Sequence, residues 1–111
     1  MAVENKSDGD IQIIVMTGRL DSSSAGEAES NVKRVLDLGA TKLLVDMSDL
    51  AYISSAGLRV VLIAAKSLHK AGGAMAICGM SPSVREVFEM TGFLKILQVF
   101  DTETEAKAAL A

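Results

Sequence analysis

The sequence predicts a single α/β domain, in which a mixed, mostly parallel β-sheet of about four to five strands packs against about four helices. Three observations lead to this prediction. A chain of 111 residues that is 50% hydrophobic can bury one core but is short for two domains. Short apolar runs alternate with segments of helical periodicity, as in helices packed on a parallel sheet. Asp8-Gly9, between the first two predicted strands, favours an antiparallel hairpin because glycine accepts the positive φ of a tight turn.

The first half of the chain should form a hairpin, a helix and a buried strand. Residues 1–10 are expected to provide a weak, flexible edge strand and the hairpin turn, and residues 11–17 (IQIIVMT) the next strand. Ser24 and Glu27 have the spacing of a capping box, which predicts a helix that stops near Gly39. Residues 42–46 (KLLVD) are expected to form a short strand buried on both faces.

The second half continues the alternation. A helix is expected from about residue 56 to residue 70, followed by a buried strand at 74–78 (AMAIC). Ser81-Pro82 predicts another helix start, since proline is favoured in the first turn. Residues 96–100 should form a last strand or extended segment, and Thr102 with Glu105 has capping-box spacing before a final helix. The predicted order is β-β-α-β-α-β-α-β-α.

The composition argues against several classes of protein. The formal net charge is −3 with both signs interspersed, unlike the basic footprint of a nucleic-acid binder. Cys78 is the single cysteine and cannot form an internal disulfide, which fits a reducing compartment. The polar start, MAVENKSDGD, lacks a signal-peptide core, and the longest aliphatic run, residues 60–65, is too short to cross a bilayer. We therefore expect a cytoplasmic protein without nucleic-acid or membrane partners.

Two adjacent serines stand where a strand and its loop enter the predicted helix, in the octapeptide YISSAGLR (residues 52–59). Either Ser54 or Ser55 can accept a backbone N–H bond as the N-cap, an effect of about 1 kcal/mol. Gly57 in the first turn permits another backbone or a ligand to approach closely. A helix cap is therefore a complete structural explanation of the motif. A hydroxyl at a helix N-terminus is also a favourable position for a phosphate, because the exposed N–H groups and the helix dipole stabilise an anion.

The same helix has a face that could contact another protein. Helical periodicity turns one set of apolar residues towards the sheet, namely Leu58, Val61, Leu62, Ala65 and Leu68. Val60 and Ile63 then fall on the opposite side, beside Arg59 and next to the serines. An exposed apolar pair of this kind can mark a protein contact. The alternative is that a neighbouring helix covers it, and periodicity alone favours neither.

Four segments in order resemble the anti-sigma factor antagonists of the STAS domain family. They are GRLDSSSA (residues 18–25), LLVDMSDLAYISSAGL (43–58), the glycine pair before AMAIC, and SPSVREVFEMTGF (81–93). The similarity extends from about residue 11 to residue 110. The resemblance implies a single STAS-type domain over residues 1–111 that acts as a partner switch in transcription regulation, without catalytic residues, metal or cofactor of its own.

In such a switch, the unphosphorylated antagonist binds an ATP-bound serine kinase that doubles as an anti-sigma factor. Phosphorylation releases the kinase, and a serine/threonine phosphatase reverses the modification. The family's acceptor position falls on Ser55. Ser54 replaces the family's aspartate and is a rival acceptor, and Ala56 replaces its second Ser or Thr. Asp21 matches a family aspartate at the kinase interface. The docking surface implied is Ser54, Ala56, Gly57, Leu58, Arg59, Val60 and Ile63, with Asp21, Ser22 and Ser23 as its rim.

Other interpretations of the sequence are also possible. The second function compatible with the resemblance is a constitutive, unphosphorylated STAS subunit or scaffold of a lipid or anion transporter. A receiver-like phosphoprotein would use Asp46, which is expected to end a strand, but Asp46 and Asp49 are more typical of a turn and a loop acid. His69 is expected to face partly towards the core, and without partner ligands it does not predict a transition-metal site. Cys78 is expected to fill the core.

Overall fold

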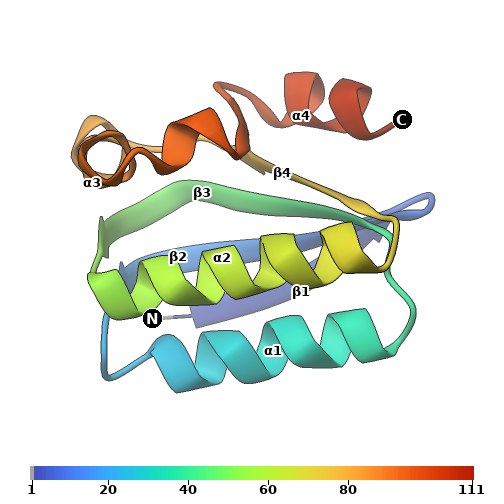
Figure 1. The fold of residues 1–111 in the computed structure, drawn as a ribbon, viewed down its shortest axis with the longest axis horizontal. Helices are drawn as coiled ribbons and strands as arrows, with labels where there is room; N and C mark the ends of the chain where they lie inside the picture. The colour runs from blue at the N-terminus through green and yellow to red at the C-terminus, as the bar shows by residue number, and fades with distance from the viewer. Residues whose placement is uncertain (1) are drawn as a thin grey trace.

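The computed structural model describes residues 2–111 and has the predicted order of elements (Figure 1). An α/β fold is therefore confirmed, with five strands and four α-helices within the described residues. The elements are β1 (Ala2–Asp8), β2 (Ile11–Leu20), α1 (Ala25–Asp37), β3 (Lys42–Ile53), α2 (Ser55–Lys70), β4 (Ala74–Cys78), α3 (Pro82–Thr91), the 3-10 turn η1 (Phe93–Lys95), β5 (Gln98–Phe100) and α4 (Glu103–Leu110).

The sheet has the spatial order β1-β2-β3-β4-β5. β1 pairs antiparallel with β2 through the hairpin at Gly9, whose φ is +62°, and the other neighbouring pairs are parallel. Because β2, β3 and β4 run in the same direction, their carboxyl ends lie at one edge of the sheet. The segments that follow β2 and β3 therefore meet there, at the edge where ligand and partner sites of α/β folds commonly form.

Helices cover both faces of the sheet (Figure 1). Ile14 of β2 and Val45 of β3 belong to the larger buried cluster, which includes side chains of α1 and α2. Their sequence neighbours Ile13 and Leu44 point to the other face and pack with Leu110 of α4. Alternate residues of a strand face opposite sides, so a strand covered on both faces is apolar at successive positions. This explains the continuous runs in the sequence.

β3 is longer than predicted and continues to Ile53 instead of ending near Asp46. The polar residues that suggested a loop lie within the strand. The Asp46 carboxylate accepts hydrogen bonds from the Ser48 amide at 2.9 Å and from the Ser48 hydroxyl at 2.6 Å. Asp49 pairs with Thr17 of β2 after a register shift between Val15 and Thr17. Such an irregularity hides strand periodicity from sequence reading, and the expected turn at Asp46 and loop at Asp49 were wrong.

β5 is shorter than the predicted 96–100, because η1 intervenes and the sheet takes up only Gln98–Phe100. Ile96 is left outside the sheet with 70% of its surface exposed. By contrast, the predicted cap of α4 is confirmed, since the Thr102 hydroxyl accepts a bond from the Glu105 amide at 3.2 Å.

The beginning of α2 packs against the end of β2 at Gly57. A Cβ atom on Gly57 would lie 2.7 Å from both Cγ and the carbonyl oxygen of Leu20, and 2.9 Å from Cγ1 of Ile53. No larger residue fits without moving the helix or the strand. The close approach of the two backbones at this corner therefore depends on glycine.

We expect Gly57→Ala to lower the free energy of unfolding by about 1–3 kcal/mol, because an added methyl group overpacks this contact. Gly26 in α1 is the matched control, since a Cβ there meets nothing within 4 Å. Gly26→Ala should raise the free energy of unfolding by about 0.5–1 kcal/mol through helix propensity. Urea denaturation of the three proteins measures both effects, and equal changes in the two variants would contradict the tight contact.

Candidate functional site

Ser54 is the N-cap of α2 and is held in place by two hydrogen bonds. Its hydroxyl accepts from the Gly57 amide at 3.4 Å. Its own amide donates to the Leu20 carbonyl at 2.9 Å, which ties the start of α2 to the end of β2. Of the two serines that could cap the helix, the structure therefore selects Ser54.

Ser55 is the first residue of α2 and is exposed. Within residues 2–111 its hydroxyl makes no hydrogen bond, whereas its neighbour's hydroxyl is used for the cap. The side chain contributes little to the fold and lies at the positive end of the helix dipole. It is thus an accessible hydroxyl on the surface whose alteration need not disturb the helix.

The turn after β2 brings Asp21 to the same edge of the sheet. The Asp21 carboxylate accepts from the Ser23 hydroxyl at 2.6 Å and from the Ser23 amide at 3.0 Å, and lies 3.6 Å from Nε of Arg19. The hydrogen bonds from Ser23, with a smaller contribution from the Arg19 charge, lower the pKa of Asp21 below its usual value. Asp21 is therefore a fixed negative charge beside the corner, and Ser22 next to it is exposed.

Ser24 has a different role from the one predicted. It precedes α1 but its hydroxyl does not cap the helix, so the expected capping box with Glu27 was wrong. The hydroxyl is buried, donates to the Arg19 carbonyl at 2.8 Å and accepts from the Asp21 amide at 3.0 Å. These bonds close the turn on itself and so fix the backbone of Asp21.

Arg19 and Tyr52 are surface residues of the corner that sequence reasoning missed. They are partners in the parallel register of β2 and β3, and the Arg19 guanidinium carbon lies 4.3 Å from the centre of the Tyr52 ring. This distance is typical of a cation–π contact. Tyr52 stands two residues before Ser54 and is 41% exposed. The pairing depends on strand register, and no local pattern in the sequence indicates it.

Part of the predicted docking surface lies inside the protein. Gly57, Leu58 and Val60 are buried, with only 4% of Val60 exposed. Val60 lies against α1, so the alternative in which a neighbouring helix covers the apolar pair was right for this residue. Ile63 remains 38% exposed and Arg59 is exposed. Ser54 and Ala56 are half-buried.

The remaining candidate residues, His69 and Cys78, differ in exposure. His69 is exposed on α2, so its expected orientation towards the core was wrong. Cys78 is buried, as predicted, and burial, reinforced by the Asp46 carboxylate, raises the pKa of its thiol to about 12. Within residues 2–111, no group of three or more His, Cys, Asp or Glu side chains could hold a metal ion. Nor does this part of the chain contain a helix both long and apolar enough to span a membrane.

Comparison with known proteins points to one family for the chain as a whole. The STAS domain profile matches residues 2–106. BtrV of Bordetella bronchiseptica, named as an anti-sigma factor antagonist, is 41% identical over 105 residues, which cover 95% of this chain and 90% of BtrV. The crystal structure of a Thermotoga maritima protein with the same assignment superposes with a TM-score of 0.93 at 26% identity, covering 97% and 93% of the two chains. The Bacillus cell-fate determinant SpoIIAA in its phosphorylated form shares the fold, with a TM-score of 0.76 at 22% identity and coverage of 99% and 100%.

The two serines should differ in their contribution to stability. Ser54→Ala removes the cap and should lower the free energy of unfolding by about 1 kcal/mol. Ser55→Ala removes an unbonded, exposed hydroxyl and should change it by no more than about 0.5 kcal/mol. Thermal and urea unfolding of both variants measures the difference. A larger loss for Ser55→Ala than for Ser54→Ala would mean that Ser55 is the structural residue of the pair.

Proposed function

The chain belongs to the STAS domain family, and we propose that it is an anti-sigma factor antagonist whose binding to its partner is switched by phosphorylation of Ser55. The observation that carries the proposal is that the two serine hydroxyls differ in their hydrogen bonding. Ser54 is committed to the helix cap, while Ser55 is exposed and free of hydrogen bonds to residues 2–111. A kinase can therefore modify Ser55 without breaking an interaction that the fold needs.

A phosphate on Ser55 is compatible with the folded protein. It adds about −1.5 to −2 charges at pH 7. At the first position of α2 these charges lie near the N–H groups and the positive end of the dipole, which stabilise an anion. The phosphate therefore acts on a partner that docks at this surface, through charge repulsion and the cost of removing its hydration.

The partner in this proposal is an anti-sigma factor that is also a serine kinase with bound ATP. It binds the unphosphorylated protein and transfers the γ-phosphoryl group of ATP to the Ser55 hydroxyl. The hydroxyl loses its proton in this step, and ADP remains in the kinase. The complex then dissociates. A serine/threonine phosphatase hydrolyses the phosphoserine and regenerates the binding form. This chain is the non-enzymatic member of the cycle, which we assign to the cytoplasm.

Several surface residues support the same binding face. Asp21 presents a lowered-pKa carboxylate at the neighbouring turn, and Arg19 and Tyr52 form an ordered pair between that turn and the serines. Charged groups at the edge of an interface mainly set partner choice and association rate. We therefore assign Asp21 to partner recognition and Ser55 to the switch.

The test is to measure phosphorylation and binding separately. Phosphosite mapping on protein purified from its own cells should find a stable phosphate on Ser55. With the purified anti-sigma factor kinase of the same organism, Ser55→Ala should bind as the wild type does but accept no phosphate. Ser55→Asp should bind more weakly, by about tenfold or more, since it places a charge at the contact. Titration calorimetry or surface plasmon resonance measures both affinities.

Ser7→Asp is the control for an added charge, because Ser7 is exposed on β1 and pairs with Gln12 at the start of β2, the end of that strand away from the serines. It should bind normally. Phosphate on Ser54 instead of Ser55 would retain the switch but reject the acceptor. Absence of phosphate during growth, stress and stationary phase, with normal binding by Ser55→Asp, would reject the switch and favour a constitutive STAS subunit.

A further inference from the structure

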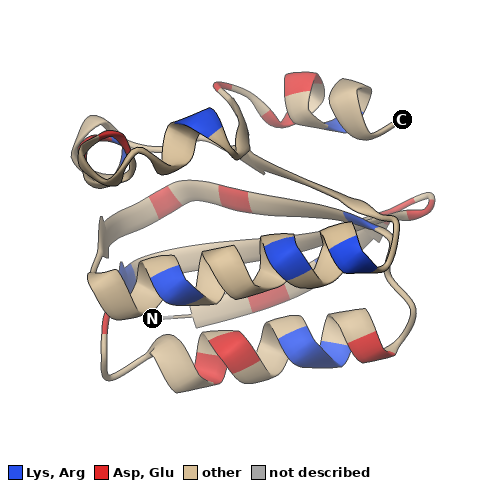
Figure 2. Cartoon of the chain, viewed as in Figure 1, with Lys and Arg blue, Asp and Glu red and all other residues tan. Residues whose placement is uncertain are grey.

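The exposed side of α2 carries a stripe of basic residues that begins at the phosphoacceptor position. At 100° per residue, five exposed residues fall within an arc of about 80° along the helix. They are Ser55, Arg59, Ile63, Lys66 and Lys70, which we call the α2 stripe. From end to end the stripe is about 22 Å long, given a rise of 1.5 Å per residue. Figure 2 shows basic residues at intervals along this helix.

The charges of the α2 stripe are not paired with acidic side chains within residues 2–111. Residues 55–70 include no Asp or Glu, although the formal charge of the whole chain is −3. Arg59, Lys66 and Lys70 form no ion pair with any residue in 2–111, whereas five other basic side chains do. The positive charge of the stripe is therefore available to another molecule.

Helix stability does not explain this pattern. A helix dipole favours acidic residues in the first turn and basic residues in the last. Lys70 and the adjacent His69 fit that preference at the end of α2. Arg59, however, lies near the N-terminal end, and the first turn contains no acid. The helix dipole therefore does not account for the cations at Arg59 and Lys66.

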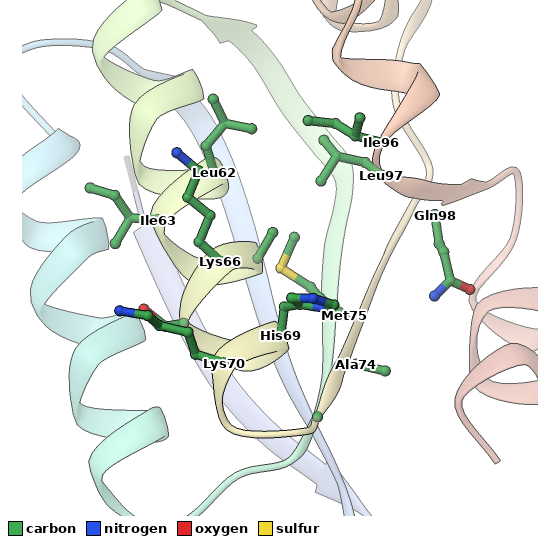
Figure 3. A pocket seen from close by; sticks show the side chains of 13 residues that line it. Leu62, Ile63, Lys66, His69, Lys70, Ala74, Met75, Ile96, Leu97 and Gln98 are labelled. Atoms are coloured by element: carbon green, nitrogen blue, oxygen red, sulfur yellow. The ribbon is translucent and has the colours of Figure 1, made fainter.

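An apolar groove runs beside the α2 stripe. It has a volume of about 630 Å³ and lies between α2 and the segment from η1 to β5, with β4 as its floor (Figure 3). Leu62 faces Ile96 and Leu97 across it, and Met75 also lines it. Among residues 2–111 no carboxylate lines the groove, and the basic residues Lys66 and Lys70 border it. It offers an apolar partner side chain a site next to positive charge.

The opposite side of the α2 stripe is different. A second hollow, between α1 and α2, has Glu29, Lys33 and Asp37 along its border and is therefore mixed in charge. An acidic partner is favoured on the stripe and its groove more than on α1. This contrast in charge indicates that the partner docks on the groove side of the α2 stripe and not on the α1 side.

We propose that the α2 stripe, from Ser55 to Lys70, docks an acidic amphipathic segment of the partner protein, with an apolar side chain of that segment in the groove beside Lys66 and Leu97. This inference rests on the proposed function, because it identifies the partner as the anti-sigma factor. It extends the contact along the whole of α2, beyond Ser54 and Ser55. It also explains why phosphorylation would weaken binding and not strengthen it. Phosphoserine at position 55 reverses the charge at one end of the stripe and lies four residues from Arg59, close enough to pair with it.

The test compares charge reversals on and off the α2 stripe, with the purified anti-sigma factor kinase as the binding partner. Lys66→Glu should weaken binding about tenfold at low salt, with most of the loss in the association rate, and the loss should shrink as salt is raised. Lys70→Glu is a second variant and should act in the same direction. Arg34→Glu is the control, since Arg34 is exposed on α1, pairs with no acid in residues 2–111 and borders a hollow on the β1 side. It changes the net charge equally and should bind as the wild type does.

Ile96→Ala tests the groove independently of charge, because Ile96 is 70% exposed and contributes little to the core. It should weaken binding about threefold to tenfold without a change in unfolding temperature.

Normal binding by the Lys66 and Lys70 variants, or an equal loss in Arg34→Glu, would overturn the proposal while leaving the phosphoswitch intact. If wild-type protein binds no anti-sigma factor, the proposed function itself fails. Retained partner affinity in Lys66→Glu together with lost binding to phosphatidylglycerol vesicles would make the stripe a lipid contact and overturn the proposal.

Discussion

The close contact between the start of α2 and the end of β2 positions the two serines and the turn at Asp21. Gly57 approaches Leu20 so closely that no side chain fits between them, and the Ser54 amide donates to the Leu20 carbonyl at 2.9 Å. One residue beyond Leu20, the chain turns at Asp21. The two connections that leave the carboxyl ends of β2 and β3 are therefore held together by backbone hydrogen bonding and by the absence of a side chain at Gly57.

This arrangement separates structural from exposed hydroxyl groups. Ser54 and Ser24 use their side chains to bond backbone atoms, the first at the cap of α2 and the second inside the turn that presents Asp21. The Ser55 hydroxyl makes no such bond within residues 2–111 and lies on the surface, next to Ser54 in the chain. A phosphate at Ser55 meets a helix end that already accommodates an anion, so its energetic cost is borne by a binding partner and not by the fold. In the proposed switch, the fixed backbone of this corner lets a single added charge control association.

In our proposal, the charge distribution gives α2 a second role beyond packing. Its buried side contributes Leu58, Val61 and Leu68 to the core, while its exposed side concentrates unpaired basic residues in a chain that is acidic overall. Such a local excess of one sign attracts partners of opposite charge over a distance of about 10 Å at physiological salt. The proposed phosphoacceptor belongs to the same helical face. One face of one helix can thus combine an electrostatic binding surface with the group that changes its sign.

The sequence by itself determined the order of the elements, the bounds of β4, the cap of α4 and the presence of a serine at the start of α2. These features depend on periodicity, capping spacing and turn residues, which act over a few neighbouring positions. Only the tertiary structure decided which serine caps α2, that α1 buries Val60, and that Arg19 stacks on Tyr52. It also decided that β3 continues through Asp46 to Ile53 and that His69 is exposed. Each of these depends on which distant segment packs against the residue in question, and the local pattern of one chain does not contain that information.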